Sequence, residues 1–224
     1  MKLLITSIVL LGLASPTLAV DKAALDKRIQ TMTGKFEILQ GKPDKRIPAE
    51  ELRKAKGIVF LDRTKAGFVF AFEAGVGVAM LKDAKSGRWS PPAFLRAKEA
   101  SLGLQVGGQQ SFVVILLMNT NATRALIEAN FKFGGEASGT AGDASGKAED
   151  TFSDEGRALM RVYSAAEGLY GGVSLKGGDL SPDDEADIAY YGEYLTTKQI
   201  LLDGKAKPSE SATTLAQKIT QFAK

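Results

Sequence analysis

Two residue types, cysteine and histidine, are missing from this chain of 224 residues. Without cysteine, no disulfide holds the fold and no thiolate serves as a nucleophile or metal ligand. Without histidine, the chain lacks the usual general base at neutral pH and the commonest nitrogen ligand for zinc. These absences exclude hydrolases of the Ser-His-Asp type and histidine-based metalloenzymes. Composition leaves open an enzyme that uses carboxylates alone, and we expect neither a metal nor a cofactor.

Two weaker catalytic or cofactor patterns also fail. Segment 141–147 (AGDASGK) approaches a phosphate-binding loop, but Ala148 stands where a Ser or Thr must hold magnesium. Glu73 ends an apolar run just before a predicted turn at 74–77, and a buried carboxyl there would have a raised pKa and act as a general acid. Because no second carboxylate can be matched to it, we expect Glu73 in solvent at a strand end or paired with a cation.

The amino-terminal residues 1–19 have the pattern of a secretory signal peptide. Lys2 precedes an apolar run from Leu3 to Ala14, and the segment ends in small residues at Ala19. The apolar run is shorter than the roughly 20 residues of a membrane-spanning helix, so a cleaved signal is preferred to a retained anchor. We expect cleavage after Ala19 and a mature protein that is periplasmic or secreted.

Charge is distributed unevenly, although the net charge is only +3. Residues 21–65 hold 12 Lys and Arg against 7 Asp and Glu, whereas residues 136–195 hold 4 against 13. The basic part suits anionic lipid head groups, which attract each nearby Lys or Arg by about 1 kcal/mol. The acidic part offers a docking surface for a basic protein. The alternative is that both parts are ordinary solvated faces.

Residues 20–45 predict an amphipathic helix followed by a polar turn. Its apolar residues are spaced by four and three and fall on one stripe: Leu25, Ile29, Met32, Phe36 and Leu39. Basic residues lie off the stripe, so the helix also suits a membrane interface. Such a stripe more often packs on the domain's own sheet, and we prefer that interpretation. Gly34 weakens the helix and marks a position where it would break.

Residues 46–224 predict one α+β domain, with a strongly curved antiparallel sheet or barrel-like core flanked by helices. Glycines inside the strands indicate sharp bends or close approach of neighbouring backbones. Strands are expected at 57–61, 67–73, 76–81, 94–99, 101–106, 111–118 and 131–137, and a hairpin over 157–175 turns at 167–168. Helices are expected from Pro48, over 120–129, from Ser181 to about Tyr191, and over 197–202 and 209–222.

Short motifs occur along the chain in a specific order. They are AKG at 55–57, KAGF at 65–68, GVG at 75–77, WSPP at 89–92, FVV at 112–114, LMN at 117–119, GLYGGVSL at 168–175 and AYYG at 189–192. In this order and spacing they resemble the SYLF-domain family of the Ysc84 type, a family of lipid-binding modules. The resemblance covers roughly residues 46–205.

The resemblance implies lipid or membrane binding rather than catalysis, and makes residues 46–224 a SYLF-like lipid-binding domain. Eukaryotic members are associated with phosphoinositides and actin, which an exported protein does not routinely meet. We therefore expect an anionic phospholipid or membrane surface as the partner, an envelope protein as the alternative partner, and no nucleic acid. The candidate head-group contacts are Lys35, Lys42, Lys45, Arg46, Arg53, Lys54 and Lys56.

Overall fold

The computed structural model describes residues 20–67, 70–102, 107–128, 131–133, 149–152, 159–168 and 178–224. The predicted signal peptide at 1–19 and the loop at 141–148 lie outside these residues. Some side chains within the described strands are likewise outside the description, including that of Glu73.

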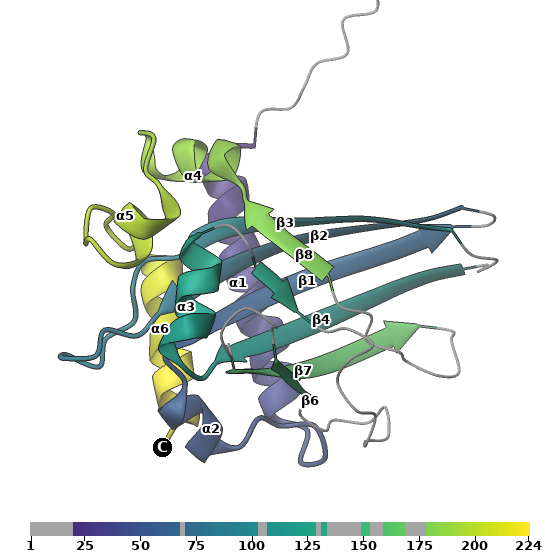
Figure 1. The fold of residues 1–224 in the computed structure, drawn as a ribbon, viewed down its shortest axis with the longest axis horizontal. Helices are drawn as coiled ribbons and strands as arrows, with labels where there is room; N and C mark the ends of the chain where they lie inside the picture. The colour runs from purple at the N-terminus through teal and green to yellow at the C-terminus, as the bar shows by residue number, and fades with distance from the viewer. Residues whose placement is uncertain are drawn as a thin grey trace, which may run out of the picture.

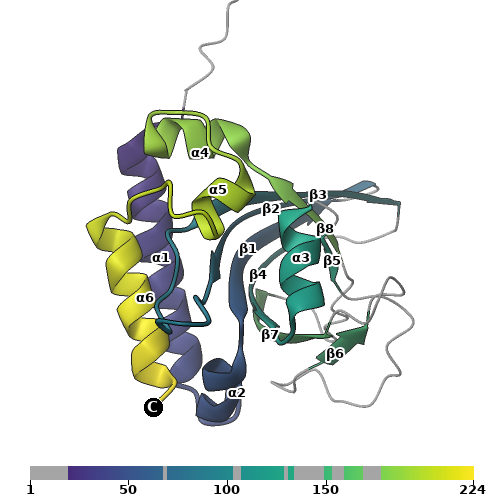
Figure 2. The same cartoon turned by 60° about the vertical axis from the view of Figure 1, so that its left-hand side comes forward.

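A single antiparallel sheet is the framework of the molecule, as Figure 1 shows. Its strands are β1 (Gly57–Gly67), β2 (Phe70–Leu81), β3 (Ala93–Leu102), β4 (Gly107–Leu117), β5 (Phe131–Phe133), β6 (Glu149–Phe152), β7 (Leu159–Gly168) and β8 (Gly178–Pro182). They lie in the order β5-β8-β3-β2-β1-β4-β7-β6. The expected α+β class with helices flanking an antiparallel sheet is confirmed. The described strands form an open, bent sheet rather than a closed barrel (Figure 2).

Helices cover both faces of this sheet. They are α1 (Lys22–Gln40), α2 (Ala49–Lys54), α3 (Thr120–Ile127), α4 (Asp184–Tyr191), α5 (Thr197–Leu201) and α6 (Glu210–Phe222). In Figure 2, α1 and α6 lie side by side on one face, and α3 lies on the other. The sheet is therefore the middle layer of three.

Alternation along β1 explains why both faces are covered. Ile58 and Phe60 are buried in one core cluster with residues of α1, α2, α4 and α6. Val59 and Leu61 are buried in the other, with residues of α3 and α5. Because successive strand side chains point to opposite faces, an apolar run such as IVFL requires cover on both sides.

Helix α1 belongs to the core of the molecule. Its predicted stripe is fully buried, with exposed fractions between 0% and 1% from Leu25 to Leu39. Phe36 packs edge-on against Phe60 of β1 and Phe222 of α6, with ring centroids 5.2 Å and 5.4 Å apart. The preferred interpretation, a helix packed on its own sheet, is confirmed. The helix also continues through Gly34, so the expected break is wrong.

The expected turn at 74–77 is also wrong, because β2 runs without interruption through Gly75 and Gly77. Both glycines allow close packing against β1. A Cβ on Gly77 would lie 2.6 Å from the Phe60 carbonyl oxygen, and one on Gly75 would lie 3.2 Å from the Leu61 side chain. Of the two meanings expected for glycines inside the strands, close approach applies at these positions.

Three further boundaries differ from the prediction. Strand β3 is continuous from Ala93 to Leu102, where two strands were expected. Strand β7 pairs with β4 through Glu167 and Gly168, so the hairpin does not turn there. The α4 cap is Asp183 rather than Ser181, because Ser181 pairs with Arg96 in the β3–β8 ladder. Each error arises because pairing with a distant strand decides the local conformation.

Candidate functional site

The loop between α1 and α2 displays three of the seven candidate cations. Gln40 closes the loop at its base, because its side chain accepts a hydrogen bond from Ile47 N at 2.7 Å and donates one to the Ile47 carbonyl at 3.3 Å. Buried Ile47 anchors the far end. Arg46 is exposed, and Lys42 and Lys45 are partly exposed. Within the described part of the chain, none of these three side chains has a carboxylate within ion-pair distance.

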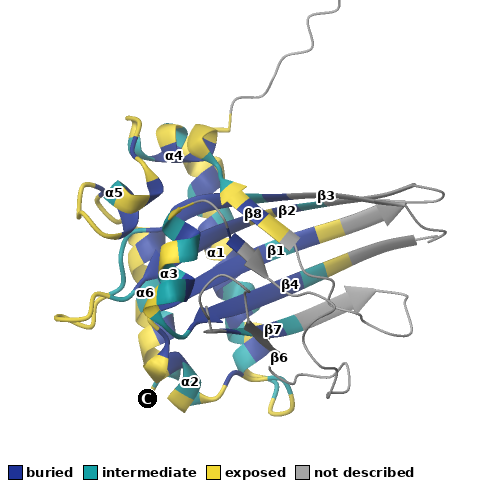
Figure 3. Cartoon of the chain, viewed as in Figure 1, coloured by how far each residue is buried: buried dark blue, intermediate teal, exposed yellow. Residues whose placement is uncertain are grey.

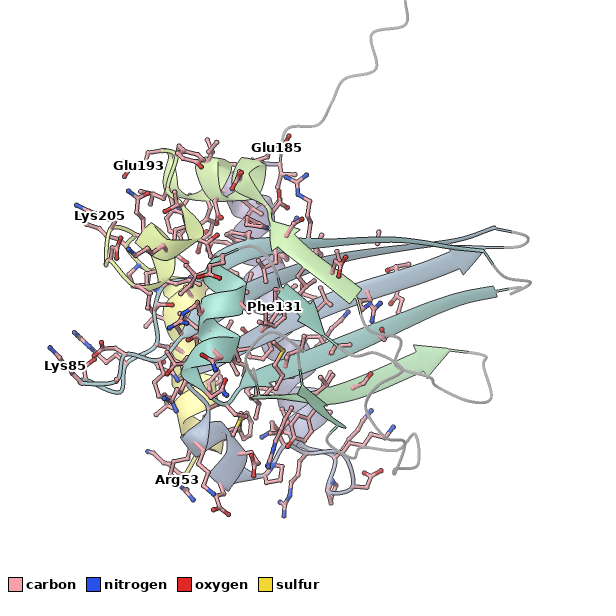
Figure 4. The ribbon with its side chains drawn as sticks, in the orientation of Figure 1. Arg53, Lys85, Phe131, Glu185, Glu193 and Lys205 are labelled. Atoms are coloured by element: carbon pink, nitrogen blue, oxygen red, sulfur yellow. The ribbon has the colours of Figure 1, made fainter. Side chains whose placement is uncertain are left out.

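Three further candidates lie on or just after α2, at the same end of the molecule. Arg53 donates a hydrogen bond to the Ala223 carbonyl at 3.1 Å, and Lys56 donates one to the Thr120 hydroxyl at 3.2 Å. Neither contact neutralises a charge. Lys54 forms an exposed ion pair with Glu50 at 2.7 Å, one helical turn earlier. All three side chains are exposed, and Figure 4 shows Arg53 pointing away from the fold.

Lys35 is placed differently from the other six. It lies on α1 and forms an ion pair with Asp62 of β1, with 2.5 Å between Nζ and Oδ2. Both side chains are partly buried between helix and sheet. The structure therefore brings six candidates to the α1–α2 end and gives Lys35 a partner inside the fold. We name these six the basic surface: Lys42, Lys45, Arg46, Arg53, Lys54 and Lys56.

Lys82 adjoins the basic surface and is missed by the sequence prediction. Its Nζ donates hydrogen bonds to the carbonyl oxygens of Leu52 and Arg53, at 3.2 Å and 3.0 Å, and lies 4.8 Å from the centroid of the Trp89 ring. Burial lowers the pKa of Lys82. A cation is attracted to the partial negative charge on the last carbonyls of a helix, so Lys82 stabilises the position of α2. The pairing of β1 with β2 could have placed Lys82 beside the basic surface, because Lys56 directly precedes β1 and Lys82 directly follows β2.

Glu73, the candidate general acid, lies inside β2 rather than before a turn. Its neighbours in register are Lys65 on β1 and Glu99 on β3. The expectation of a strand-end position is therefore wrong.

A polar cluster joins the amino-terminal part of α1 to α4 and α6. Asp26 Oδ1 accepts hydrogen bonds from the hydroxyls of Tyr190, Ser209 and Ser211, at 3.1, 2.9 and 2.5 Å. Partial burial acts to raise the pKa of Asp26, but these hydrogen bonds outweigh it and the pKa is lowered. Ser209 is also the α6 N-cap. Because every member is already bonded within the fold, the cluster is a structural connection between helices.

Asp187 of α4 carries a fully buried carboxyl, only 1% exposed. Its Oδ1 accepts a hydrogen bond from the Phe94 N–H at 3.0 Å, which fixes α4 against the beginning of β3. Its Oδ2 has no hydrogen-bond partner in the described part of the chain. Burial raises the pKa of Asp187 to about 7; the Phe94 hydrogen bond opposes the rise, and Asp184 and Asp183 add to it.

Comparison with known families identifies the chain. Residues 98–222, more than half of the chain, match the Ysc84 family, described as "Las17-binding protein actin regulator". The chain belongs to this family. The match confirms the resemblance drawn from the motifs. None of the relatives below is named for a reaction.

Relatives from yeast and vertebrates extend the match towards the amino terminus. LAS seventeen-binding protein 3 of Saccharomyces cerevisiae is 34% identical over 168 residues, 74% of this chain and 36% of its own length. Protein YSC84 of the same yeast is 34% identical over 172 residues, 75% of this chain and 36% of its own. The human SH3 domain-containing YSC84-like protein 1 is 29% identical over 170 residues, 75% of this chain and 49% of its own. The chain thus spans about a third to a half of these relatives.

No solved structure matches the chain. Among the helices that the structure describes, none has the length and apolar character that crossing a membrane requires.

Proposed function

We propose that this Ysc84-family chain is an exported, non-enzymatic protein that binds anionic phospholipid at the cell envelope through the basic surface. The supporting observation is that six cations from a short stretch of sequence are displayed together at the α1–α2 end. In the described residues, only Lys54 among them has a carboxylate partner. Each such cation near an anionic membrane contributes about 1 kcal/mol of attraction, which salt weakens.

Export fits the position of the first described element. Helix α1 begins at Lys22 with Asp21 as its cap, so cleavage after Ala19 removes none of the described helices or strands. Edman sequencing of the protein recovered from the periplasm or medium tests this part of the proposal. A first residue of Val20 supports it, whereas recovery only from the cytoplasm with residues 1–19 intact contradicts it.

The three cations of the α1–α2 loop give the sharpest test of lipid binding. In the described part of the chain, the side chains of Lys42, Lys45 and Arg46 form no ion pair, so K42E/K45E/R46E leaves the fold's own contacts in place. We expect this variant to lose most binding to phosphatidylglycerol-containing vesicles in co-sedimentation, while its thermal unfolding stays close to that of the parent. Unchanged binding would exclude the loop from the lipid contact.

Lys35 supplies a control from the same predicted set. Its partner is Asp62, so K35M is expected to lower stability and leave vesicle binding nearly unchanged. If K35M keeps its stability but loses most vesicle binding, Lys35 takes part in the lipid contact.

Protein docking is the second candidate function, since the family description and the yeast relative's name concern binding of Las17. In this chain it would use the acidic region 136–195. The described part of that region includes α4, where exposed Asp184 and Glu185 lie beside Ile188, whose exposed fraction is 43%. This function predicts no vesicle binding and an envelope complex that D184N/E185Q disrupts in cross-linking. Binding to anionic vesicles that is insensitive to D184N/E185Q would favour the lipid function.

A further inference from the structure

The connection between β2 and β3 is a well-defined hairpin tip. Lys82 and Trp89 form a β-bridge, Asp83 N donates to the Arg88 carbonyl at 2.8 Å, and Gly87 N donates to the Asp83 carbonyl at 2.9 Å. Gly87 has φ 69°, a left-handed conformation that favours glycine. In Figure 1 this connection projects beyond the helices at one end of the sheet.

Two cations are displayed at this tip. Lys85 and Arg88 are exposed, and Figure 3 shows the tip exposed. The one acid in the tip, Asp83, accepts hydrogen bonds on Oδ1 from the Ser86 N–H and hydroxyl, at 2.6 Å each, and its charge offsets part of that of Lys85. Neither Lys85 nor Arg88 has a carboxylate within ion-pair distance among the described residues. The tip therefore presents positive charge on a backbone that is already ordered.

Lys82 connects this tip to the basic surface. Its hydrogen bonds to the Leu52 and Arg53 carbonyls attach the base of the hairpin directly to the end of α2. In Figure 4, Lys85 points outward at the left of the molecule and Arg53 points outward at its lower edge, from two different elements. Segments that are about 30 residues apart in sequence therefore contribute cations to adjoining parts of the surface.

We propose that the β2–β3 hairpin tip is a second membrane-contacting arm, with Lys85 and Arg88 bound to anionic head groups while the basic surface binds others. This inference rests on the proposed lipid function and adds its geometry. A bilayer surface suits two arms on separate elements, because it offers many head groups in one plane and both arms can bind at once. Since the tip is already ordered, little conformational entropy is lost on contact.

The test compares two double charge reversals in the mature protein, residues 20–224. K85E/R88E changes the tip, and K205E/K207E makes the same charge change at two exposed lysines between α5 and α6. Each is titrated with phosphatidylcholine vesicles, with and without phosphatidylglycerol, at low and physiological salt. We expect K85E/R88E to lower the partition coefficient on anionic vesicles by about thirtyfold or more, and K205E/K207E to lower it much less.

Equal losses in the two variants, or no loss in either, would overturn the second arm while leaving lipid binding itself intact. If the unmodified protein binds no vesicle, the proposed function fails, and the second arm fails with it. Thermal unfolding of each variant guards against a folding defect, and K85Q/R88Q provides a milder change if the reversal destabilises the hairpin. Selective loss in K85Q/R88Q supports the proposal in the same way, and its absence counts against it.

Discussion

At the scale of single residues, glycines in strands and in helices have opposite roles. Gly77 lies where β1 and β2 approach closely, and an added Cβ would lie 2.6 Å from a backbone oxygen. Gly34 lies within α1, and an added Cβ would meet nothing within 4 Å. The first position requires glycine, while the second only makes the unfolded chain more flexible.

We therefore expect Gly77→Ala to lower the free energy of unfolding by about 2 kcal/mol or more, because the strands must separate to admit the methyl group. Gly34→Ala should raise it by up to about 1 kcal/mol. Urea denaturation of the two variants measures both effects. If both substitutions change the free energy of unfolding in the same direction and by similar amounts, the close approach of β1 and β2 does not require glycine at position 77.

Asp187 predicts a pH dependence of stability. Its pKa rises from 3.8 to about 7 in the folded protein, so the folded state holds the proton more tightly than the unfolded state. Its contribution is therefore present below about pH 4 and is lost as pH rises towards about 7. The rise corresponds to at most about 4 kcal/mol. Asp187→Asn keeps an acceptor for the Phe94 N–H and removes the titration.

The stability of D187N relative to the parent should therefore increase between pH 4 and pH 8, measured by urea denaturation at each pH. Glu185→Gln is the matched control, because Glu185 is exposed on the same helix and is not among the charges that raise the pKa of Asp187. A difference between D187N and the parent that stays constant with pH would show that the Asp187 carboxyl titrates normally.

At the scale of elements, the Asp26 cluster connects α1 to α4 and α6. Removing its carboxylate takes away the acceptor that three hydroxyls share, although these still contact one another, so we expect Asp26→Ala to cost about 2 kcal/mol of stability. Asp21→Ala, which removes only the exposed α1 cap, should cost about 1 kcal/mol or less. Chemical denaturation of both variants makes the comparison. A smaller cost for D26A than for D21A would contradict a connecting role.

The elements show which features a single sequence can predict. The stripe of α1 and the helices expected over 120–129, 197–202 and 209–222 depend on local spacing, and the structure has a helix in each of these places. Continuity of β2 through its glycines could not be predicted, because it depends on Phe60 and Leu61 of another strand. The same reason applies to Ser181, a favourable cap by itself that pairs with β3 instead. At the candidate site, six cations share one stretch of sequence, but the hairpin tip becomes their neighbour only through strand pairing.

At the scale of the whole molecule, three layers place the basic surface at one end of the fold. The helices α1 and α6 bury one face of the sheet, α3 and α5 bury the other, and the α1–α2 loop, α2 and the β2–β3 hairpin are left to face solvent. The central proposal is that this end meets an anionic membrane. Attraction of that kind depends on lipid charge and weakens with salt.

Co-sedimentation of residues 20–224 with neutral and with anionic liposomes, at low and at physiological salt, tests this proposal most directly. We predict binding to phosphatidylglycerol-containing vesicles that weakens with salt, and little binding to phosphatidylcholine alone. No binding to either kind of vesicle at either salt concentration would contradict it.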